Sequence, residues 1–245
     1  MNPELLGALL LCILVVAALY STVGHGGASG YIAAMALFSM SPAALKPTAL
    51  VLNILVAAVG SFSFARAGHF SWRLFWPFAL TSIPCSFIGG YVTLPPHLYR
   101  PLVGIILVAS ACRLLFHAEP DKEGIRPPPI PVALLAGGLL GLLSGLTGVG
   151  GGIFLSPLLL FLGWGRTKEV SAVAALFILV NSAAGLAGHV SGLHGVPGFA
   201  PVLAVAAVAG GVLGSWAGSR VLPVTGVVRA LSAVLTIAGL KLLLV

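Results

Sequence analysis

Two glycine-rich stretches carry the residues whose types and spacing could bind a ligand. The first reads G-H-G-G-A-S-G over residues 24–30, and the second reads L-T-G-V-G-G-G-I-F-L-S-P over residues 146–157. Each Gly costs about 1 kcal/mol relative to Ala inside a helix, so such runs predict a backbone that unwinds and restarts. A restarting helix presents N–H groups and the positive end of its dipole, which favour an anion. The glycines could also serve only to let helices cross closely.

Polar side chains in and near these stretches could complete such a site. Asn53 and Asn181 each lie inside an apolar run, where an amide usually faces protein or a cavity. Each could form an interhelical hydrogen bond, or could donate to an oxyanion without adding charge. Ser29, Thr147 and Ser156 flank the glycines and could bind the ligand or cap the restarting helix.

One histidine, His25, lies within a glycine stretch. It could bind an anion, relay a proton because its ordinary pKa is near neutral, or have a structural role. His189 and His194 are five residues apart, which does not place both on one helical face. The three cysteines lie in apolar runs without metal or redox spacing, so we expect no metal and no cofactor.

Several kinds of chemistry are disfavoured by what the sequence lacks. No Lys-Ser/Thr pair follows Gly150–Gly152, so the run is not a nucleotide-binding loop. No Ser-His-Asp set or pair of catalytic carboxylates can be assembled, which argues against an enzyme. The central apolar runs contain no Asp or Glu, which disfavours a carboxylate-based cation pump. The predicted substrate-binding residues are Gly24, His25, Gly26, Gly27, Ser29, Asn53, Thr147, Gly148, Gly150, Gly151, Gly152 and Asn181.

The composition indicates which elements must position these residues. Of 245 residues, 59% are hydrophobic and 7% are charged, whereas soluble domains carry roughly 25% charged residues. Lipid must therefore surround most of the chain. The net charge of +7 does not indicate nucleic-acid binding, because the basic residues are scattered at the ends of apolar runs.

The chain divides into ten apolar pieces. They cover residues 5–22, 28–41, 47–65, 74–93, 99–117, 131–146, 152–163, 170–190, 199–219 and 227–245. A full membrane span needs about 20 residues. The second and seventh pieces are short and each follows a glycine stretch, so they are either short tilted spans or re-entrant half-helices.

A polar, proline-rich segment over residues 118–130 separates two halves, 1–117 and 131–245. The glycine stretches match at an offset of 124 residues, and Asn53 matches Asn181 at an offset of 128. We place the four extra residues around 163–166. The later matches are Gly90 with Gly218, Leu94-Pro95 with Leu222-Pro223, and Arg100 with Arg229. The shared order predicts an internal repeat.

Five pieces per half predict that the two repeats are inverted. The placement of Lys and Arg tests this, because these residues concentrate on the cytoplasmic side. One side collects nine: Arg66, Arg73, Arg113, Lys122, Arg126, Arg166, Lys168, Arg220 and Arg229. The other side collects three: Lys46, Arg100 and Lys241. This distribution places both termini outside the cytoplasm; Lys46, Arg66 and Arg166 could also draw anions to the mouths of a pathway.

The chain resembles the TauE/SafE-type sulfite/sulfonate exporter family. The resemblance rests on the paired glycine stretches, the following Pro157, the asparagine in a later span of each half and the bipartite length. The resemblance covers essentially the whole chain. It implies a bacterial inner-membrane protein of two homologous halves that moves small sulfur-containing anions such as sulfite, sulfoacetate or related organosulfonates. The second stretch fits the family's G-x-G-G-G pattern. The first departs from it, because Ala28 replaces the third glycine and no proline follows.

Together these observations predict an all-α polytopic membrane protein with two inverted repeats, each containing a glycine-broken helix. We expect a secondary transporter that exports a small sulfur-containing oxyanion by alternating access at the repeat interface. The alternatives are a passive anion channel and a non-transporting membrane subunit. The expected partners are the small anion and the lipid bilayer, and the apolar exterior would permit a homodimer.

Overall fold

The computed structural model describes residues 3–22, 24–115, 125–193, 195–218, 236, 239–240 and 242–244. Within 3–218 the described residues form nine helices and no strand, as the prediction of an all-helical chain requires. The helices are α1 (Pro3–Thr22), α2 (Ala28–Leu37), α3 (Pro42–Arg66), α4 (Trp72–Tyr91), α5 (Pro96–Leu115), α6 (Ile130–Thr147), α7 (Gly152–Phe161), α8 (Thr167–Ser191) and α9 (Ala200–Gly218). They coincide with the first nine apolar pieces. Most of the tenth piece and of the polar segment lies outside the described residues, as do His194, Leu222-Pro223 and Arg229.

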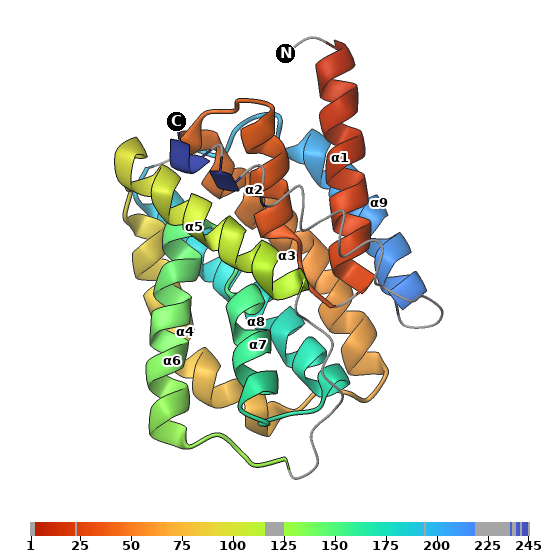
Figure 1. Cartoon of the computed structure of the whole chain (residues 1–245), viewed down its shortest axis with the longest axis vertical. Coiled ribbons are helices and arrows are strands. Elements are labelled where there is room, and N and C mark those ends of the chain that lie inside the picture. Colours follow the sequence, from red (N-terminus) through yellow and green to blue (C-terminus); the bar gives the residue numbers. More distant parts are fainter. Residues whose placement is uncertain are drawn as a thin grey trace.

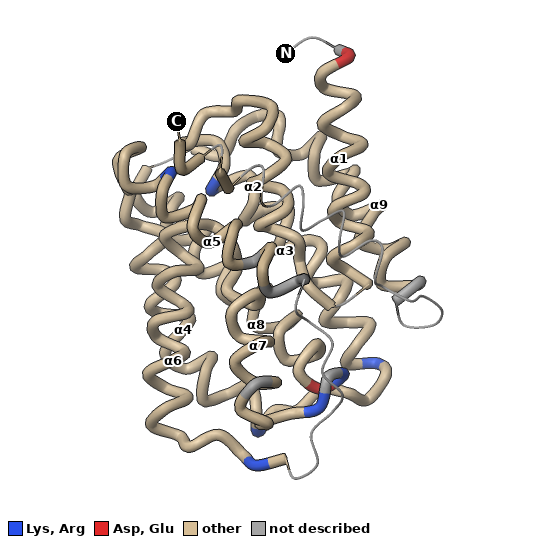
Figure 2. The backbone as a smooth tube through the Cα atoms, in the orientation of Figure 1, with Lys and Arg blue, Asp and Glu red and all other residues tan. Residues whose placement is uncertain are grey.

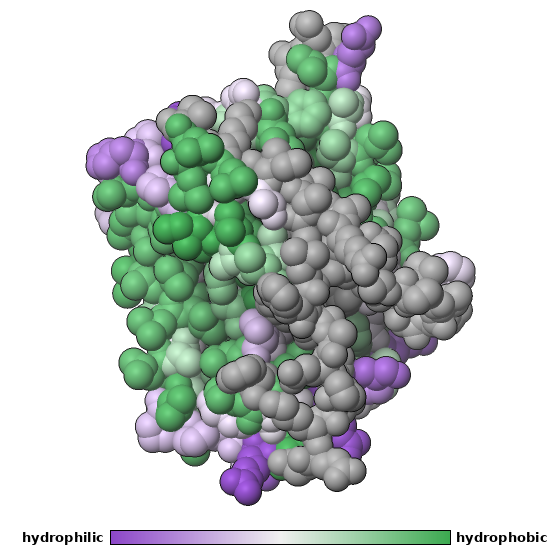
Figure 3. Space-filling model, viewed as in Figure 1, coloured by the Kyte–Doolittle hydropathy of each residue, from purple (hydrophilic) through white to green (hydrophobic). Residues whose placement is uncertain are grey.

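Four helices are long and apolar enough to cross a membrane. These segments are Glu4–Thr22, Pro42–Arg66, Ile130–Thr147 and Lys168–Ser191. Large apolar side chains point outward from the bundle, as a lipid environment favours. Figure 3 shows this apolar surface between more polar regions toward the upper and lower ends. The protein is therefore a multi-pass membrane protein.

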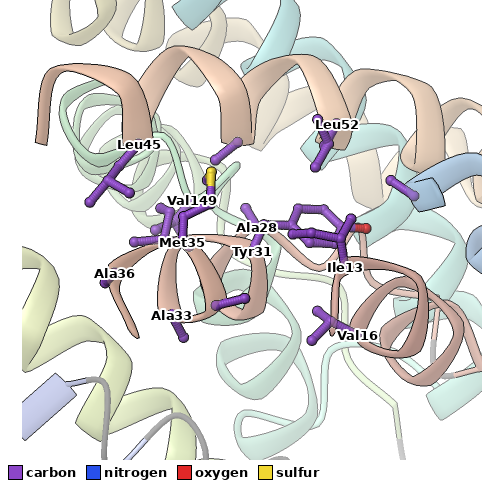
Figure 4. Packing of buried hydrophobic residues seen from close by; sticks show 14 of the residues in the cluster. Ile13, Val16, Ala28, Tyr31, Ala33, Met35, Ala36, Leu45, Leu52 and Val149 are labelled. Carbon is purple, nitrogen blue, oxygen red and sulfur yellow. The ribbon is translucent and has the colours of Figure 1, made fainter. Parts of the chain in front are cut away.

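The two short helices α2 and α7 follow the glycine stretches directly. Each has ten residues, which corresponds to about 15 Å, whereas the hydrocarbon core of a bilayer is about 30 Å thick. Neither short helix can cross the membrane alone. Residues 28–36 of α2 are all buried, so α2 is packed inside the protein. Figure 4 shows Met35 and Tyr31 of α2 among Leu45, Leu52 and Val149.

Several helix contacts of one half have counterparts in the other half. α4 packs on α6 and α8, and α9 packs correspondingly on α1 and α3. α2 lies against α3 in the same way that α7 lies against α8, while α3 and α8 contact each other. Figure 1 shows α3 and α8 in the middle of the bundle, with the α4–α6 pair on one side and the α1–α9 pair on the other.

Glycines allow close helix–helix contacts. A Cβ atom placed on Gly141 would collide with the Ser82 backbone of α4, and one placed on Gly214 would collide with the Ala18 backbone of α1. Small residues four apart let membrane helices approach this closely. Glycines with this spacing make such close contacts at Gly137, Gly141 and Gly145 of α6 and at Gly210 and Gly214 of α9.

The helix bounds correct the predicted alignment of the two asparagines. α3 and α8 each have 25 residues; Asn53 lies 11 residues after the first residue of α3, and Asn181 lies 14 after the first residue of α8. Ile178, not Asn181, therefore occupies the position of Asn53. The extra four residues are divided between two loops, one before α8 and three after it, and are not all near 163–166. Apolar helices carry no sequence marker that reveals such a shift.

Candidate functional site

Both glycine stretches unwind as predicted. We call residues 24–27 the first break and residues 147–152 the second break. Gly24 and Gly27 have φ angles of 74° and 93°, and their counterparts Gly148 and Gly151 have 82° and 76°. Gly150 has a φ angle of 81°. L side chains rarely adopt this left-handed backbone, so glycine is required at these positions. Gly27 and Gly151 directly precede α2 and α7.

The two breaks meet at one point. A Cβ atom placed on Gly26 would lie 2.6 Å from Oδ1 of Asn53 and 3.0 Å from Cγ2 of Ile178. A Cβ atom placed on Gly150 would lie 2.5 Å from Nδ2 of Asn53 and 3.0 Å from the same Ile178 atom. Asn53 and Ile178 both lie at the middle of a 25-residue helix. The breaks therefore meet near mid-depth of the bundle, as predicted for a site shared by two halves.

The Asn53 amide holds the second break in place. The side chain is fully buried, and Nδ2 donates to the Val149 carbonyl oxygen and to Ser182 Oγ, both at 3.3 Å. Because a carbonyl can only accept, the nitrogen must face Val149, which fixes the orientation of the amide. Oδ1 is buried beside Gly26 without a hydrogen-bond partner among the described residues. The predicted donor is thus already engaged, and an acceptor faces the first break.

Asn181 makes different contacts. It is fully buried, but Nδ2 donates to the Phe177 carbonyl oxygen of its own helix at 2.8 Å. Its backbone oxygen accepts a hydrogen bond from Ser86 Oγ at 2.7 Å. In the described part of the chain, these hydrogen bonds go to α8 and α4 and to neither break. Its predicted role in substrate binding stays a prediction.

A hydrogen bond between His25 and Ser156 joins the two halves. Nε2 of His25 lies 3.1 Å from Ser156 Oγ, and this hydroxyl donates to the Gly152 carbonyl oxygen at 3.0 Å. A hydroxyl that donates to a carbonyl can accept from a protonated Nε2. His25 of the first break therefore lies beside α7, the helix that follows the second break. Ser156 lies in α7, four residues after Gly152, the last residue of the second break.

The other predicted hydroxyls bind neighbouring groups. Ser29 Oγ lies 2.8 Å from the Tyr20 hydroxyl. Thr147 Oγ1 donates to the Leu143 carbonyl oxygen at 2.6 Å, and the Thr147 carbonyl accepts from the Tyr99 hydroxyl at 3.1 Å. Within the described residues, neither α2 nor α7 has a side-chain cap, because the residues preceding them are glycines.

Two buried hydroxyls at the breaks were not predicted from the sequence. Tyr31 and Ser144 are both fully buried, and neither hydroxyl has a hydrogen-bond partner within the described ranges. The Tyr31 hydroxyl lies against Gly27, and Ser144 lies beside Gly151. Tyr31 follows Gly27 by four residues, and helical side chains lean toward the N-terminus of their helix. This spacing was the available signal for Tyr31.

Lys46 is not at the mouth of a pathway. It is buried, with 6% of its surface exposed, and Nζ donates to the carbonyl oxygens of Gly89, Gly90 and Val92 at 2.9–3.0 Å. It therefore neutralises the C-terminal end of α4, where carbonyl groups lack helical partners. Arg66 and Arg166 are exposed. In the described part of the chain, no three His, Cys, Asp or Glu side chains lie together as metal ligands would.

Comparison with known proteins agrees with this architecture. A family model described as "Sulfite exporter TauE/SafE" matches residues 9–242. "Probable membrane transporter protein y4hK" of Sinorhizobium fredii (strain NBRC 101917 / NGR234) is 42% identical over 247 residues, covering 99% of this chain and 100% of that protein. "Probable membrane transporter protein MJ0441" of Methanocaldococcus jannaschii is 25% identical over 147 residues, covering 59% of this chain and 55% of that protein. No solved structure gives a significant match. The chain belongs to the TauE/SafE family and is a membrane transporter, not an enzyme.

Proposed function

We propose that this transporter exports a small sulfur-containing oxyanion, such as sulfite or an organosulfonate, by alternating access at the interface of its two halves. The observation that carries the proposal is the meeting of Gly26 and Gly150 at Asn53 and Ile178. Two helix N-termini, those of α2 and α7, begin beside this point. Helix N-termini attract anions through their dipoles and their N–H groups.

The directions of the helices support an inverted repeat. Gly24 lies between Phe64, near the end of α3, and Ser171, near the start of α8, so these helices run in opposite directions. In Figure 1 the sequence colours likewise run in opposite directions along α3 and α8. Corresponding helices of inverted repeats must point opposite ways, and such repeats place the substrate site at their interface.

The burial of both breaks supports an alternating-access mechanism. The described glycines of the first and second breaks are buried, and His25 of the first break is partly buried. Such burial fits an occluded intermediate between an inward-open and an outward-open state. Rocking of one half against the other would open the site on each side in turn.

The distribution of charge supports export from the cytoplasm. Figure 2 shows the larger group of Lys and Arg residues at the end of the bundle away from the N-terminus. The Arg126 backbone N–H donates to the Gly163 carbonyl oxygen at 3.2 Å, so the polar segment ends beside the loop that carries Arg166. If the more basic end of the bundle faces the cytoplasm across the inner membrane, both termini lie on the opposite side, outside the cytoplasm. A membrane potential of 100 mV, inside negative, favours export of each negative charge by about 2.3 kcal/mol.

Flux measurements in proteoliposomes test the proposal. Sulfite, thiosulfate, sulfoacetate, taurine and sulfate would be compared with chloride and Na⁺, using wild type and Asn53→Ala. We expect saturable flux of a sulfur oxyanion that Asn53→Ala reduces. Exchange of labelled substrate against its own gradient separates a transporter from a passive anion channel. Absence of oxyanion flux in folded wild-type protein would contradict the proposed substrate class.

A further inference from the structure

We propose that the hydroxyl group of Tyr31 is a substrate-binding donor of this transporter, and that it acts together with the N-terminus of α2 on an oxygen atom of the anion. The inference rests on the proposed function and identifies a residue of that same site. The first break would contribute a phenol O–H that lies beside Gly27, the residue preceding a ten-residue helix.

The position of the hydroxyl is fixed by Gly27. A Cβ atom placed on Gly27 would lie 2.8 Å from both Cζ and the hydroxyl oxygen of Tyr31. Gly27 is the residue that precedes α2, and its φ angle of 93° turns the chain into that helix. The Tyr31 hydroxyl therefore lies at the start of α2, one turn back from its own Cα atom. Figure 4 shows the Tyr31 side chain extending from α2 toward Ile13 of α1.

The hydroxyl is poised to donate. Tyr31 is 0% exposed, and its oxygen has no hydrogen-bond partner in the part of the chain that the structure describes. A buried polar group without a partner costs about 1–3 kcal/mol. A phenylalanine at this position would avoid the cost, so selection for stability alone would favour Phe over Tyr. A ligand that accepts a hydrogen bond from this group would offset the cost only while it is bound.

The surrounding groups favour an anion. The α2 dipole and the free N–H groups at its first turn present partial positive charge at the same place. Ser29, the second residue of α2, adds a hydroxyl that is paired with the Tyr20 hydroxyl at 2.8 Å. The acidic residues of the chain lie outside the central apolar runs. The site therefore suits a compact anion with several acceptor oxygens, such as a sulfite or sulfonate group.

The second break lacks this donor. Tyr31 and Leu155 each lie three residues after the first residue of their short helix, so Leu155 occupies the equivalent position in α7. A tyrosine hydroxyl is thus specific to the first half, whereas the second break has only the shorter Ser144 hydroxyl, which lies beside Gly151 without a partner among the described residues. This asymmetry predicts that the first break, although it departs from the glycine pattern of the second, contributes more to recognition of the anion.

Tyr31→Phe tests the inference because it removes only the oxygen atom. Purified full-length protein would be measured for thermal unfolding without ligand and, in proteoliposomes, for the KM of sulfite and sulfoacetate. We expect unchanged or higher thermal stability together with a KM about tenfold higher or more, the effect of losing one hydrogen bond to a charged group. Tyr91→Phe is the matched control, because Tyr91 is 55% exposed at the end of α4.

The outcomes separate this inference from the proposed function. A lower unfolding temperature for Tyr31→Phe would show that the hydroxyl has a structural partner and would overturn the inference. An unchanged KM with saturable wild-type flux would overturn the inference and keep the proposed function. Absence of saturable flux of every oxyanion in folded wild-type protein would overturn the proposed function and the inference with it.

Discussion

The Nε2 atom of His25 lies 3.1 Å from the Oγ atom of Ser156, so one hydrogen bond joins the first break to α7 in the other half of the chain. This bond crosses the interface at which we propose that the substrate binds. A change in the protonation of His25 would therefore change both the local charge and the contact between the halves.

His25→Gln is expected to flatten the pH dependence of transport. A proton on His25 would add positive charge beside the proposed site, so wild-type flux of an anion should be higher at acidic than at alkaline pH. Sulfoacetate is the appropriate probe, because its sulfonate group stays ionised at acidic pH as well. Ser156→Ala is the companion variant, since it removes the contact and keeps the histidine. An unchanged pH profile in His25→Gln would exclude His25 as a proton relay.

Asn53→Ala is expected to impair transport more than Asn181→Ala. Loss of the Asn53 amide leaves the Val149 carbonyl without its donor and frees the second break, whereas Asn181 donates within its own helix. An unpaired buried group costs about 1–3 kcal/mol, so Asn53→Ala should also lower the unfolding temperature. Uptake kinetics and thermal unfolding of both variants check this prediction. Equal transport defects would contradict the assignment of the site to the Asn53 side.

Gly150→Ala is expected to abolish saturable transport through a local clash. Its φ angle is 81°, and the new Cβ atom would lie 2.5 Å from Asn53 Nδ2. Gly68→Ala is the matched control: Gly68 has a φ angle of 76°, but no described atom lies within 4 Å of its Cβ position. In both variants, holding alanine in the left-handed backbone conformation costs about 1–2 kcal/mol. Transport that survives in Gly150→Ala and fails in Gly68→Ala would contradict the proposed site.

The breaks could be predicted from the sequence because consecutive glycines have few other uses inside an apolar chain. Gly27 and Gly151 adopt the left-handed conformation that the sequence predicts, at matching places in the two halves. The match between Asn53 and Asn181 was wrong by three residues. The loops on either side of α8 differ in length from their counterparts, and the apolar sequence gives no sign of where the extra residues fall.

Lys46 and Tyr31 show what the sequence could not reveal. A lysine at the end of an apolar run usually marks the membrane surface, and only the folded chain places the end of α4 around its ammonium group. A tyrosine in an apolar helix is usually part of the core. The four-residue spacing from Gly27 indicates where the Tyr31 hydroxyl lies, but only the packing of the folded chain buries it without a partner among the described residues.

Gly141→Ala is expected to weaken the α4–α6 contact. A Cβ atom there would meet the Ser82 backbone, which cannot move without separating the helices. Gly138→Ala is the control on the same helix, because its nearest described neighbours lie at 3.6–4.0 Å, an ordinary contact distance. We expect a lower unfolding temperature for Gly141→Ala, with a cost of about 1–3 kcal/mol from overpacking. A stable Gly141→Ala protein would show that these helices are less tightly packed.

Lys46→Met is expected to lower the thermal stability of the protein, because the role of Lys46 is structural and not the recognition of the anion. The variant removes three hydrogen bonds to the end of α4 and leaves the Gly89, Gly90 and Val92 carbonyls without their donor. Gly89 and Gly90 are buried, and each unpaired buried group costs about 1–3 kcal/mol, so the unfolding temperature should fall markedly. Lys168→Met is the control, since Lys168 is exposed near the start of α8. If Lys46 instead attracts the anion, Lys46→Met would raise the KM for sulfite at unchanged stability. Thermal unfolding combined with uptake kinetics distinguishes the two roles, because only the structural role lowers the unfolding temperature without ligand.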